Sequence, residues 1–248
     1  MNLPPRDRLY AGNMMPGDFV FDEKVAQVFD DMIHRSVPGY TTIIATTASL
    51  AEKHHQPGTR IYDLGCSLGA ASLAIAKRLG DRPCEIVAVD SSRPMLDGLA
   101  QRLAKLGGGP VRREHGDIRD CAVANASVVI LNFTLQFIAP GDRDRLLRAV
   151  YDGMSEGGVL ILSEKIVVDD PDLDALYIDL YHEFKQQMGY SELEISRKRA
   201  ALEKVLLPES LAAHRARLAA AGFAPVEQWF QCLNFASLLA FKRGAGSK

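Results

Sequence analysis

Glycines and polar side chains that could hold a nucleoside ligand recur in the first half of the chain. The segment YDLGCSLGA (62–70) completes an apolar run and has the pattern D-x-G-x-S-x-G. Gly65 and Gly69 permit a tight turn and a close approach of the backbone to a ligand, and a helix after the loop offers free N–H groups. Ser67 stands where the middle glycine would be. A dinucleotide site would have the spacing G-x-G-x-x-G, so the pattern favours another nucleoside-containing ligand.

Three further apolar runs end in residues suited to the same ligand. Asp90, about twenty residues beyond the loop, can accept hydrogen bonds from both hydroxyls of a ribose. Asp117 can accept from an adenine amino group while Ile118 packs on the ring, and Asn132 ends the fourth run. Each aspartate alone could merely cap a helix, and the asparagine could satisfy a turn. Together with the loop, whose spacing is that of S-adenosylmethionine (SAM)-dependent methyltransferases, the four run ends predict a SAM site.

Short apolar runs alternate with amphipathic stretches along the chain, which places these residues at the ends of strands. The expected strands are 60–65, 84–90, 110–117, 126–133 and 158–165, and the helices between them are 70–80, 92–107 and 140–154. Ser92 or Ser91 can cap a helix with Pro94 in its first turn, and Gly157–Gly158 is expected to stop the helix before the last of these strands. Alternation of this kind predicts right-handed crossovers in a parallel, doubly wound sheet.

The whole chain is expected to form a single methyltransferase-like domain, 1–248. Its parts are a helical N-terminal cover (1–55), a SAM-binding core (56–164), a helical insertion (165–221) and a closing hairpin (222–248). The cover and the insertion should lie over the carboxyl edge of the sheet. The predicted fold class is α/β, class I SAM-methyltransferase-like (Rossmann-like): a doubly wound, mostly parallel, seven-stranded sheet with a C-terminal antiparallel hairpin.

Composition narrows the functional classes. With 248 residues, 47% hydrophobic and 24% charged, the chain is expected to fold rather than remain disordered. A net charge of −2 gives no bulk attraction to nucleic acid. The N-terminus has no apolar leader and no run approaches the ~18 residues of a membrane span, so we expect a cytoplasmic protein that contacts no membrane. The four scattered cysteines indicate neither a metal site nor a disulfide framework.

Two common methyl-transfer chemistries lack their residues in this sequence. The segment after the fourth strand reads LNFTLQF (131–137), without the D/N-P-P-Y/F motif of many amino-group methyltransferases. It also contains no Pro-Cys pair, so a nucleophilic cysteine for pyrimidine methylation is missing. Neither reaction is expected.

Segments spread over nearly the whole chain resemble a single family. They are RSVPGY (35–40), YDLGCSLGA (62–70), GDIRD (116–120), NASVVILNFTLQF (125–137), LSEK (162–165), GYSELEISRKR (189–199) and WFQCLNFASLLAFK (229–242). Taken whole, the chain closely resembles the carboxy-S-adenosyl-L-methionine synthases, which have a methyltransferase fold but a different reaction. That family carries the same serine at the position of Ser67.

The resemblance implies a reaction and its partners. SAM and prephenate would give carboxy-S-adenosyl-L-methionine (carboxy-SAM), phenylpyruvate and water. The product would be used by a tRNA carboxymethyltransferase that modifies a hydroxylated wobble uridine, so the protein itself need not contact tRNA. The family is also dimeric, which implies a homodimer. No metal is implied.

The resemblance also assigns site residues. Arg199 matches the residue that binds the new carboxylate, for which a guanidinium has the right fork geometry. Tyr40 matches a contact in the same region, and these two form the catalytic prediction. The predicted SAM-binding residues are Tyr40, Gly65, Cys66, Ser67, Asp90, Ser91, Asp117, Ile118, Asn132 and Arg199.

Several alternatives stay open. Arg197 and Lys198 are expected on a solvated helix face rather than in a nucleic-acid patch. No side-chain base is required if the hydroxyl leaving prephenate accepts the methyl proton, so Glu164, Tyr181 and His182 are interpreted as structural. A small-molecule methyltransferase and a non-catalytic module that binds a SAM derivative remain the competing interpretations.

Overall fold

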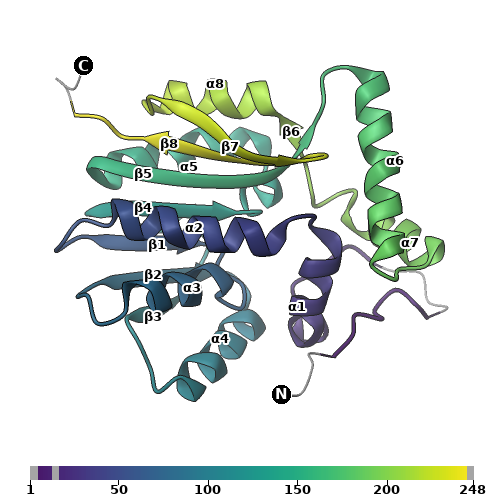
Figure 1. The fold of residues 1–248 in the computed structure, drawn as a ribbon, viewed down its shortest axis with the longest axis horizontal. Coiled ribbons are helices and arrows are strands. Elements are labelled where there is room, and N and C mark those ends of the chain that lie inside the picture. Colours follow the sequence, from purple (N-terminus) through teal and green to yellow (C-terminus); the bar gives the residue numbers. More distant parts are fainter. Residues whose placement is uncertain (1–4, 13–16, 245–248) are drawn as a thin grey trace.

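The computed structural model describes residues 5–12 and 17–244 (Figure 1). The outermost residues of the predicted cover and hairpin, and 13–16, lie outside the described residues. The strands are β1 (Arg60–Leu64), β2 (Glu85–Asp90), β3 (Val111–His115), β4 (Ala126–Asn132), β5 (Met154–Val167), β6 (Glu209–Ser210), β7 (Val226–Cys232) and β8 (Phe235–Phe241). The helices are α1 (Glu23–Ser36), α2 (Tyr40–His54), α3 (Ala70–Leu79), α4 (Arg93–Lys105), the short 3-10 turn η1 (Leu135–Phe137), α5 (Pro140–Gly153), α6 (Pro171–Gln187), α7 (Glu192–Leu202) and α8 (Leu211–Ala221).

The sheet has the predicted topology. Its strand order is β3-β2-β1-β4-β5-β8-β7, with β1 to β5 parallel and β8 antiparallel to both neighbours. The C-terminal hairpin and the doubly wound, mostly parallel sheet are therefore confirmed. One correction is needed, because the two-residue strand β6 pairs with β5 and makes the sheet eight-stranded.

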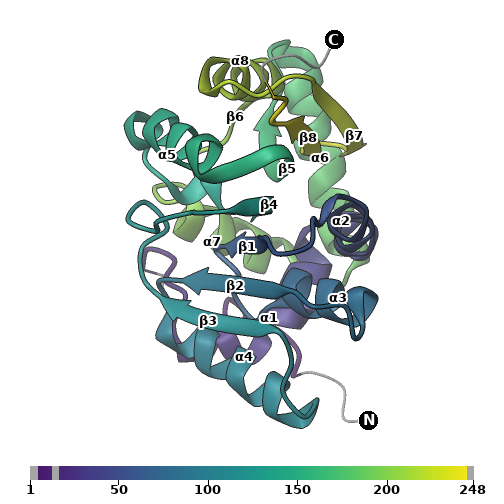
Figure 2. The same cartoon turned by 90° about the vertical axis from the view of Figure 1, so that its left-hand side faces the viewer.

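Helices cover both faces of the sheet, which explains why its central strands are apolar throughout. In β4, Val128 and Ile130 pack in the cluster that includes residues of α2 and α3. Val129 and Leu131 point the other way, into the cluster built with α5 and α8. Figure 2 shows α2 and α3 on one side of the sheet and α5 on the other. Period-two alternation thus buries every residue of the strand interior.

Helix ends follow local chemistry, with one exception to the predictions. Ser92 caps α4, its Oγ accepting the Met95 N–H at 3.3 Å, and Pro94 lies in the first turn, as predicted. The expected stop at Gly157–Gly158 is wrong, since α5 ends at Gly153 and both of those glycines lie within β5.

Two helical segments lie over the carboxyl edge of the parallel strands. In Figure 1, α1, α6 and α7 stand together at that edge. The segment 165–221 is less uniform than an insertion of helices, because β5 continues to Val167 and α8 joins the core. Leu218 of α8 shares the apolar cluster of Leu146 in α5.

Candidate active site

A cavity of about 1200 Å³ opens between the carboxyl edge of the sheet and the covering helices. Its floor is formed by the ends of β1 to β4, and its roof by α1, α6 and α7. All ten residues predicted from the sequence line it: Tyr40, Gly65, Cys66, Ser67, Asp90, Ser91, Asp117, Ile118, Asn132 and Arg199. The structure thus brings the ten together, while their individual contacts with a ligand remain predictions.

The loop after β1 requires its glycine and holds its serine in an unusual conformation. Gly65 has φ +79°, and a Cβ there would lie 2.3 Å from Cγ2 of Thr134. Ser67 has φ 47°, in the left-handed region that non-glycine residues seldom adopt. Its N–H donates to Oδ2 of Asp90 at 2.8 Å, which fixes this backbone against the end of β2. The departure at Ser67 is therefore accommodated by a specific partner.

Asp90 accepts hydrogen bonds from the backbone of the protein and can also accept them from a ligand. Besides Ser67, the Ser92 N–H donates to its Oδ1 at 2.8 Å. Its side chain is buried, and this burial raises the carboxyl pKa against the opposing effect of the two N–H donors. Each carboxylate oxygen accepts one backbone hydrogen bond and keeps a lone pair. The turn-capping role and the predicted ribose-binding role are compatible.

Asp117 is held by a neighbouring cation. Arg119 donates from Nη2 to Oδ2 at 2.6 Å and from Nε to Oδ1 at 3.0 Å, and its Nη1 reaches Asp142 at 2.9 Å. Hydrogen bonding from this guanidinium keeps the pKa of Asp117 below its usual range. Ile118 beside it is buried at the cavity wall. A fixed carboxylate next to an apolar side chain is the arrangement predicted for an adenine.

Asn132 has an unused acceptor. Its Oδ1 is buried, and no hydrogen-bond partner lies within reach among the described residues. Buried polar atoms are nearly always paired, so an orphaned acceptor on a cavity wall indicates a donor supplied by a ligand. The amino group of a SAM methionine moiety would be such a donor, so the site fits this ligand on structural grounds.

Tyr40 and Cys66 enter the cavity as neutral groups. Tyr40 is 7% exposed, and burial, with a smaller contribution from Asp63, raises the pKa of its hydroxyl well above the usual range. Burial likewise raises the pKa of the Cys66 thiol. Tyr40 is therefore a hydrogen-bond donor at neutral pH, and Cys66 has no thiolate character that would make it a nucleophile.

Four basic side chains, Lys165, Lys185, Lys198 and Arg199, line the part of the cavity under the roof. Arg199 is exposed and forms no hydrogen bond or ion pair within the part of the chain that the structure describes. The prediction that Lys198 lies on a solvated helix face is wrong, because its side chain is buried, with an exposed fraction of 7%. Its Nζ donates a hydrogen bond to Ser36 Oγ at 2.8 Å. Lys165 and Lys185 were not predicted as site residues, although Lys165 belongs to the segment LSEK that carried the resemblance.

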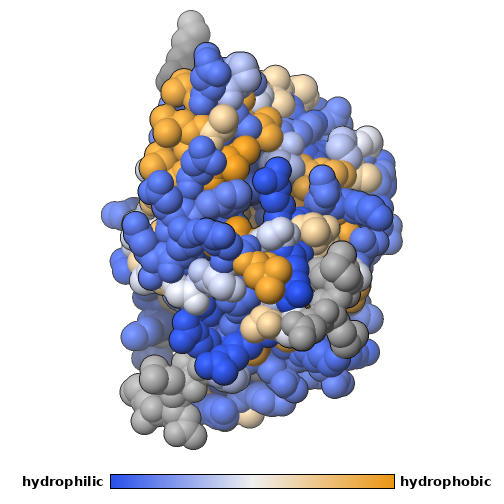
Figure 3. Space-filling model, turned by 90° about the vertical axis from the view of Figure 1, so that its right-hand side faces the viewer, coloured by the Kyte–Doolittle hydropathy of each residue, from blue (hydrophilic) through white to orange (hydrophobic). Residues whose placement is uncertain are grey.

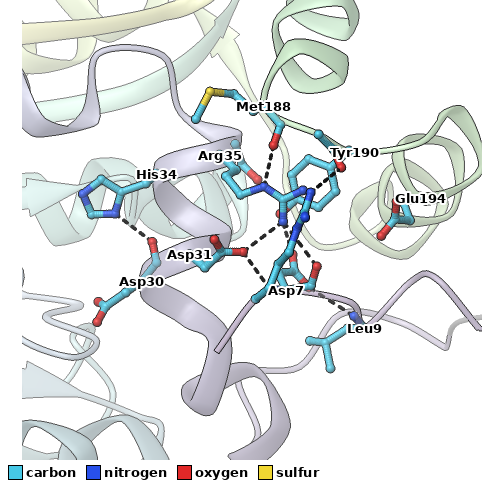
Figure 4. A network of polar contacts seen from close by, with 12 residues as sticks. Asp7, Leu9, Asp30, Asp31, His34, Arg35, Met188, Tyr190 and Glu194 are labelled. Carbon is cyan, nitrogen blue, oxygen red and sulfur yellow. Dashed lines mark hydrogen bonds and ion pairs between the residues drawn. The ribbon is translucent and has the colours of Figure 1, made fainter. Parts of the chain in front are cut away.

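A network around Asp7, Arg35 and Tyr190 connects the roof to the N-terminal segment (Figure 4), and Lys198 also contacts Asp7. The Tyr190 hydroxyl donates to Asp7 Oδ2 at 2.5 Å, and Lys198 Nζ lies 3.5 Å from the same oxygen. Arg35 of α1 pairs with Asp31 at 2.9 Å, and its guanidinium carbon lies 3.8 Å from the centre of the Tyr190 ring. The residue before Arg199 is therefore anchored from three separate segments.

The three residues interpreted as structural differ in position. Glu164 is buried away from the cavity, and its carboxylate accepts the N–H groups of Leu135 and Gln136 at 2.8 and 2.9 Å. Tyr181 and His182 do line the cavity. The Tyr181 hydroxyl donates to the Ser36 carbonyl at 2.8 Å, which is a structural bond.

Across residues 5–12 and 17–244, no helix is long and apolar enough to cross a membrane. Over those same ranges, no three His, Cys, Asp or Glu side chains lie close enough together to hold a metal ion. All four cysteines are free.

Two solved methyltransferases have a similar arrangement. Magnesium protoporphyrin IX methyltransferase of Synechocystis PCC 6803, solved with bound SAH, has a TM-score of 0.58 at 16% identity, over 96% of this chain and 92% of that one. Human N-acetylserotonin methyltransferase, solved in complex with SAM, has a TM-score of 0.60 at 18% identity, over 90% of this chain and 56% of that one. At such identities the likeness establishes the fold.

Sequence relatives are far closer. A family model described as a methyltransferase domain matches residues 61–158. The carboxy-S-adenosyl-L-methionine synthase of Vibrio cholerae is 51% identical over 242 residues, which cover 97% of this chain and 98% of the relative. The synthase of the same name in Shewanella woodyi is 53% identical over 226 residues, covering 91% and 93%. With this identity along nearly its full length, the chain belongs to the carboxy-S-adenosyl-L-methionine synthase family of enzymes.

Proposed function

We propose that this enzyme converts SAM and prephenate to carboxy-SAM, phenylpyruvate and water. The observation that carries the proposal is the position of Arg199. It is an exposed arginine without an ion pair among the described residues, on the wall of the cavity that also contains the SAM-type strand ends. Methyl transfer creates no new anion that would need such a group, whereas a carboxylate formed on the methyl carbon needs a fixed cation.

The proposed reaction balances without an oxidant or a reductant. In prephenate, the electron pair of the bond to the ring carboxyl group enters the ring as carbon dioxide departs. Hydroxide leaves from the opposite ring carbon, which yields phenylpyruvate. The hydroxide removes a proton from the sulfonium methyl of SAM and becomes water. The resulting carbanion adds to carbon dioxide, and carboxy-SAM is formed.

The residues of the chain would hold and orient the reactants. Asp90, Asp117 and Asn132 would bind the ribose, adenine and amino group of SAM. Arg199 would receive the carboxylate in a bidentate pair, and the neutral Tyr40 hydroxyl would donate to the same region. The roof would enclose carbon dioxide long enough for capture, because α1, α6 and α7 cover the edge of the sheet.

The biological setting is part of the same proposal. Carboxy-SAM would pass to a tRNA carboxymethyltransferase that modifies the wobble uridine, in the cytoplasm and without direct contact between this enzyme and tRNA. The net charge of −2 is compatible with a protein that does not bind a polyanion.

A homodimer is proposed as well. Leu173, Leu176 and Leu180 recur on one face of α6 and are 46%, 48% and 37% exposed. Figure 3 shows apolar surface gathered on the side of the molecule that carries α6 and α7. Exposed apolar stripes of this kind support a protein interface.

Mass spectrometry of the nucleoside products tests the reaction. The purified enzyme is incubated with SAM, with and without prephenate. A species heavier than SAM by one carbon dioxide, formed only when prephenate is present, is the expected result. Accumulation of S-adenosylhomocysteine instead would identify a small-molecule methyltransferase, and a bound heavy species that never increases would identify a binding module.

A further inference from the structure

Two lysines on the cavity wall, the buried Lys185 and the half-buried Lys165, have no role in the chemistry described so far. We propose that Lys185, together with Lys165, forms a second anion subsite, which binds the carboxylate of the 2-oxo acid side chain of the co-substrate. The inference rests on the proposed function, because it concerns the second substrate of that reaction. Arg199 would then bind the carboxyl group that is transferred to SAM. The lysines would bind the carboxyl group that stays on the co-substrate.

Lys185 lies in a position that is unfavourable for an ammonium unless an anion joins it. It is 6% exposed, and its Nζ lies 4.1 Å from the centre of the Tyr181 ring. Lys165 Nζ lies 5.2 Å from the centre of the same ring. Within the described part of the chain, neither ammonium group has a carboxylate partner or a hydrogen-bond acceptor. The face of the Tyr181 ring attracts both ammonium groups but carries no net charge. Buried charges are normally paired with an opposite charge, so the buried Lys185 on a cavity wall, with the half-buried Lys165 beside the same ring, indicates an anionic ligand.

Neighbouring charges reinforce the need for an anion. Burial, and then the charges of Lys165, Lys198 and Arg199, lowers the pKa of Lys185 to about 7. Burial and the charge of Arg199 also lower the pKa of Lys165, against the weaker attraction of Asp174. A bound carboxylate would oppose this repulsion and raise the pKa of both lysines.

The surroundings of the lysines suit a ring-containing acid. Tyr181, Phe235 and Phe133 line the cavity beside them, with ring centres 5.1 Å apart for the first two and 6.0 Å for the last two. Cavities for a single small ligand are typically about 300–1000 Å³. At about 1200 Å³, this cavity is large enough for SAM and a second, aromatic-sized ligand side by side. The aromatic side chains would pack against the ring of the co-substrate, and the two ammonium groups would bind the carboxylate of its side chain.

The test compares Lys185→Met with a matched control. Methionine keeps most of the length and the unbranched apolar character of the side chain but removes its charge. Lys53→Met is the control, because Lys53 is an exposed lysine of α2 that does not line the cavity. The KM for prephenate is expected to rise at least tenfold in Lys185→Met, while the Kd of SAM from calorimetry changes less than twofold. Lys185→Arg should restore part of the loss, and the control should behave as wild type.

Two outcomes overturn the subsite. An unchanged KM for prephenate in a folded Lys185→Met would show that the ammonium binds no part of this substrate. Equal losses of prephenate and SAM binding, with no recovery in Lys185→Arg, would show a structural role. Circular dichroism establishes whether each variant is folded.

A ligand comparison on the unaltered enzyme keeps the inference testable if Lys185→Met does not fold. Phenylpyruvate and phenylacetone differ only in the carboxylate, which a methyl group replaces in the latter. Phenylpyruvate is expected to bind the SAM-loaded enzyme at least tenfold more tightly in calorimetry, and equal affinities would refute the subsite. Since this readout needs no turnover, it also separates the two proposals. An enzyme that binds phenylpyruvate selectively but forms no carboxy-SAM from prephenate would refute the proposed function alone.

Discussion

Arg199 is expected to distinguish the product from the substrate. Arg199→Ala should weaken carboxy-SAM binding by about 1.5–3 kcal/mol, the range for hydrogen bonds to charged groups, and leave SAM binding nearly unchanged. A larger penalty is not expected, because the side chain is exposed and the pair forms in partial contact with water. Calorimetric titration with both ligands measures the two affinities.

Arg145→Ala provides the reference for that titration. Arg145 lies on α5 with its side chain 63% exposed, and it does not line the cavity. Losing this arginine should affect neither ligand. If Arg199→Ala weakened SAM and carboxy-SAM by the same factor, the guanidinium would not contact the carboxylate.

The strand-end residues could be predicted from the sequence because a parallel sheet brings all its carboxyl ends to one edge. Asp90, Asp117 and Asn132 therefore needed only the order of the strands to be placed in one cavity. The lysines could not be placed in this way. Lys198 is buried against residues distant in the sequence, among them Asp7, 191 residues away, and Ser36. A solvated helix face gives the same local pattern in the sequence.

The loop between β1 and α3 tolerates no side chain at its first glycine. Gly65→Ala would combine a strained φ of +79° with a Cβ 2.3 Å from Thr134. We expect a loss of about 2–4 kcal/mol in the free energy of unfolding, of which roughly 1 kcal/mol is backbone strain and the rest overpacking. SAM affinity should fall with it, since the loop carries Ser67. Urea unfolding and calorimetry measure the two effects.

Gly58→Ala separates strain from overpacking. Gly58 has the same φ of +79°, but nothing lies within 4 Å of a Cβ built there. Only the strain of about 1 kcal/mol should appear, with unchanged SAM affinity. Similar losses in both glycine variants would mean that contact with Thr134 does not restrict the loop.

Strand β6 is short, but it positions the partner of a buried arginine. Glu209 accepts from Arg143, which is fully buried, and from Arg217 Nη1 at 2.6 Å. Glu209→Gln should destabilise the fold by roughly 2 kcal/mol, less than for a fully buried pair because solvent reaches the carboxylate. Asp144→Asn, which alters the 80% exposed partner of Arg217, should cost under about 1 kcal/mol.

The same carboxylate gives the stability a pH dependence. Partial burial acts to raise the pKa of Glu209, but hydrogen bonds from Arg217 and Arg143 lower it to about 2, against an ordinary 4.5. Because the folded-state pKa is depressed, its contribution is present above pH 4.5 and is lost as the pH falls toward 2. Urea unfolding at pH 7 and pH 3 should therefore show a smaller difference between Glu209→Gln and wild type at pH 3. An equal difference at both values would contradict this assignment.

Periodicity in the sequence predicted the helices and strands that are long and apolar. It did not predict the short ones. Two-residue β6 has no alternation to detect, so only its pairing with Ile166 and Val167 of β5 defines it. The misplaced helix end at Gly157 has a similar cause. Gly157 lies within β5 with a φ of 76°, a value that favours glycine. Its N–H donates a hydrogen bond to the carbonyl of Lys242.

Assembly of the enzyme is expected to depend on the apolar face of α6. Leu176→Glu should convert a dimer to a monomer in sedimentation velocity, because a carboxylate in the centre of this stripe would have to lose its hydration in the interface. Leu106→Glu is the matched control, since Leu106 is a 68% exposed leucine at the end of α4. A dimer that survives Leu176→Glu would place the interface on another face.

The network of Asp7, Tyr190 and Lys198 also sets an order for synthesis on the ribosome. The strands that form the floor of the cavity are complete once Asn132 has left the exit tunnel. The roof must wait until Lys198 emerges, and closing a loop of that length is a slow, entropically costly step. During this interval Asp7 remains without its partners, so its contacts with the roof are expected to form in the last stage of folding.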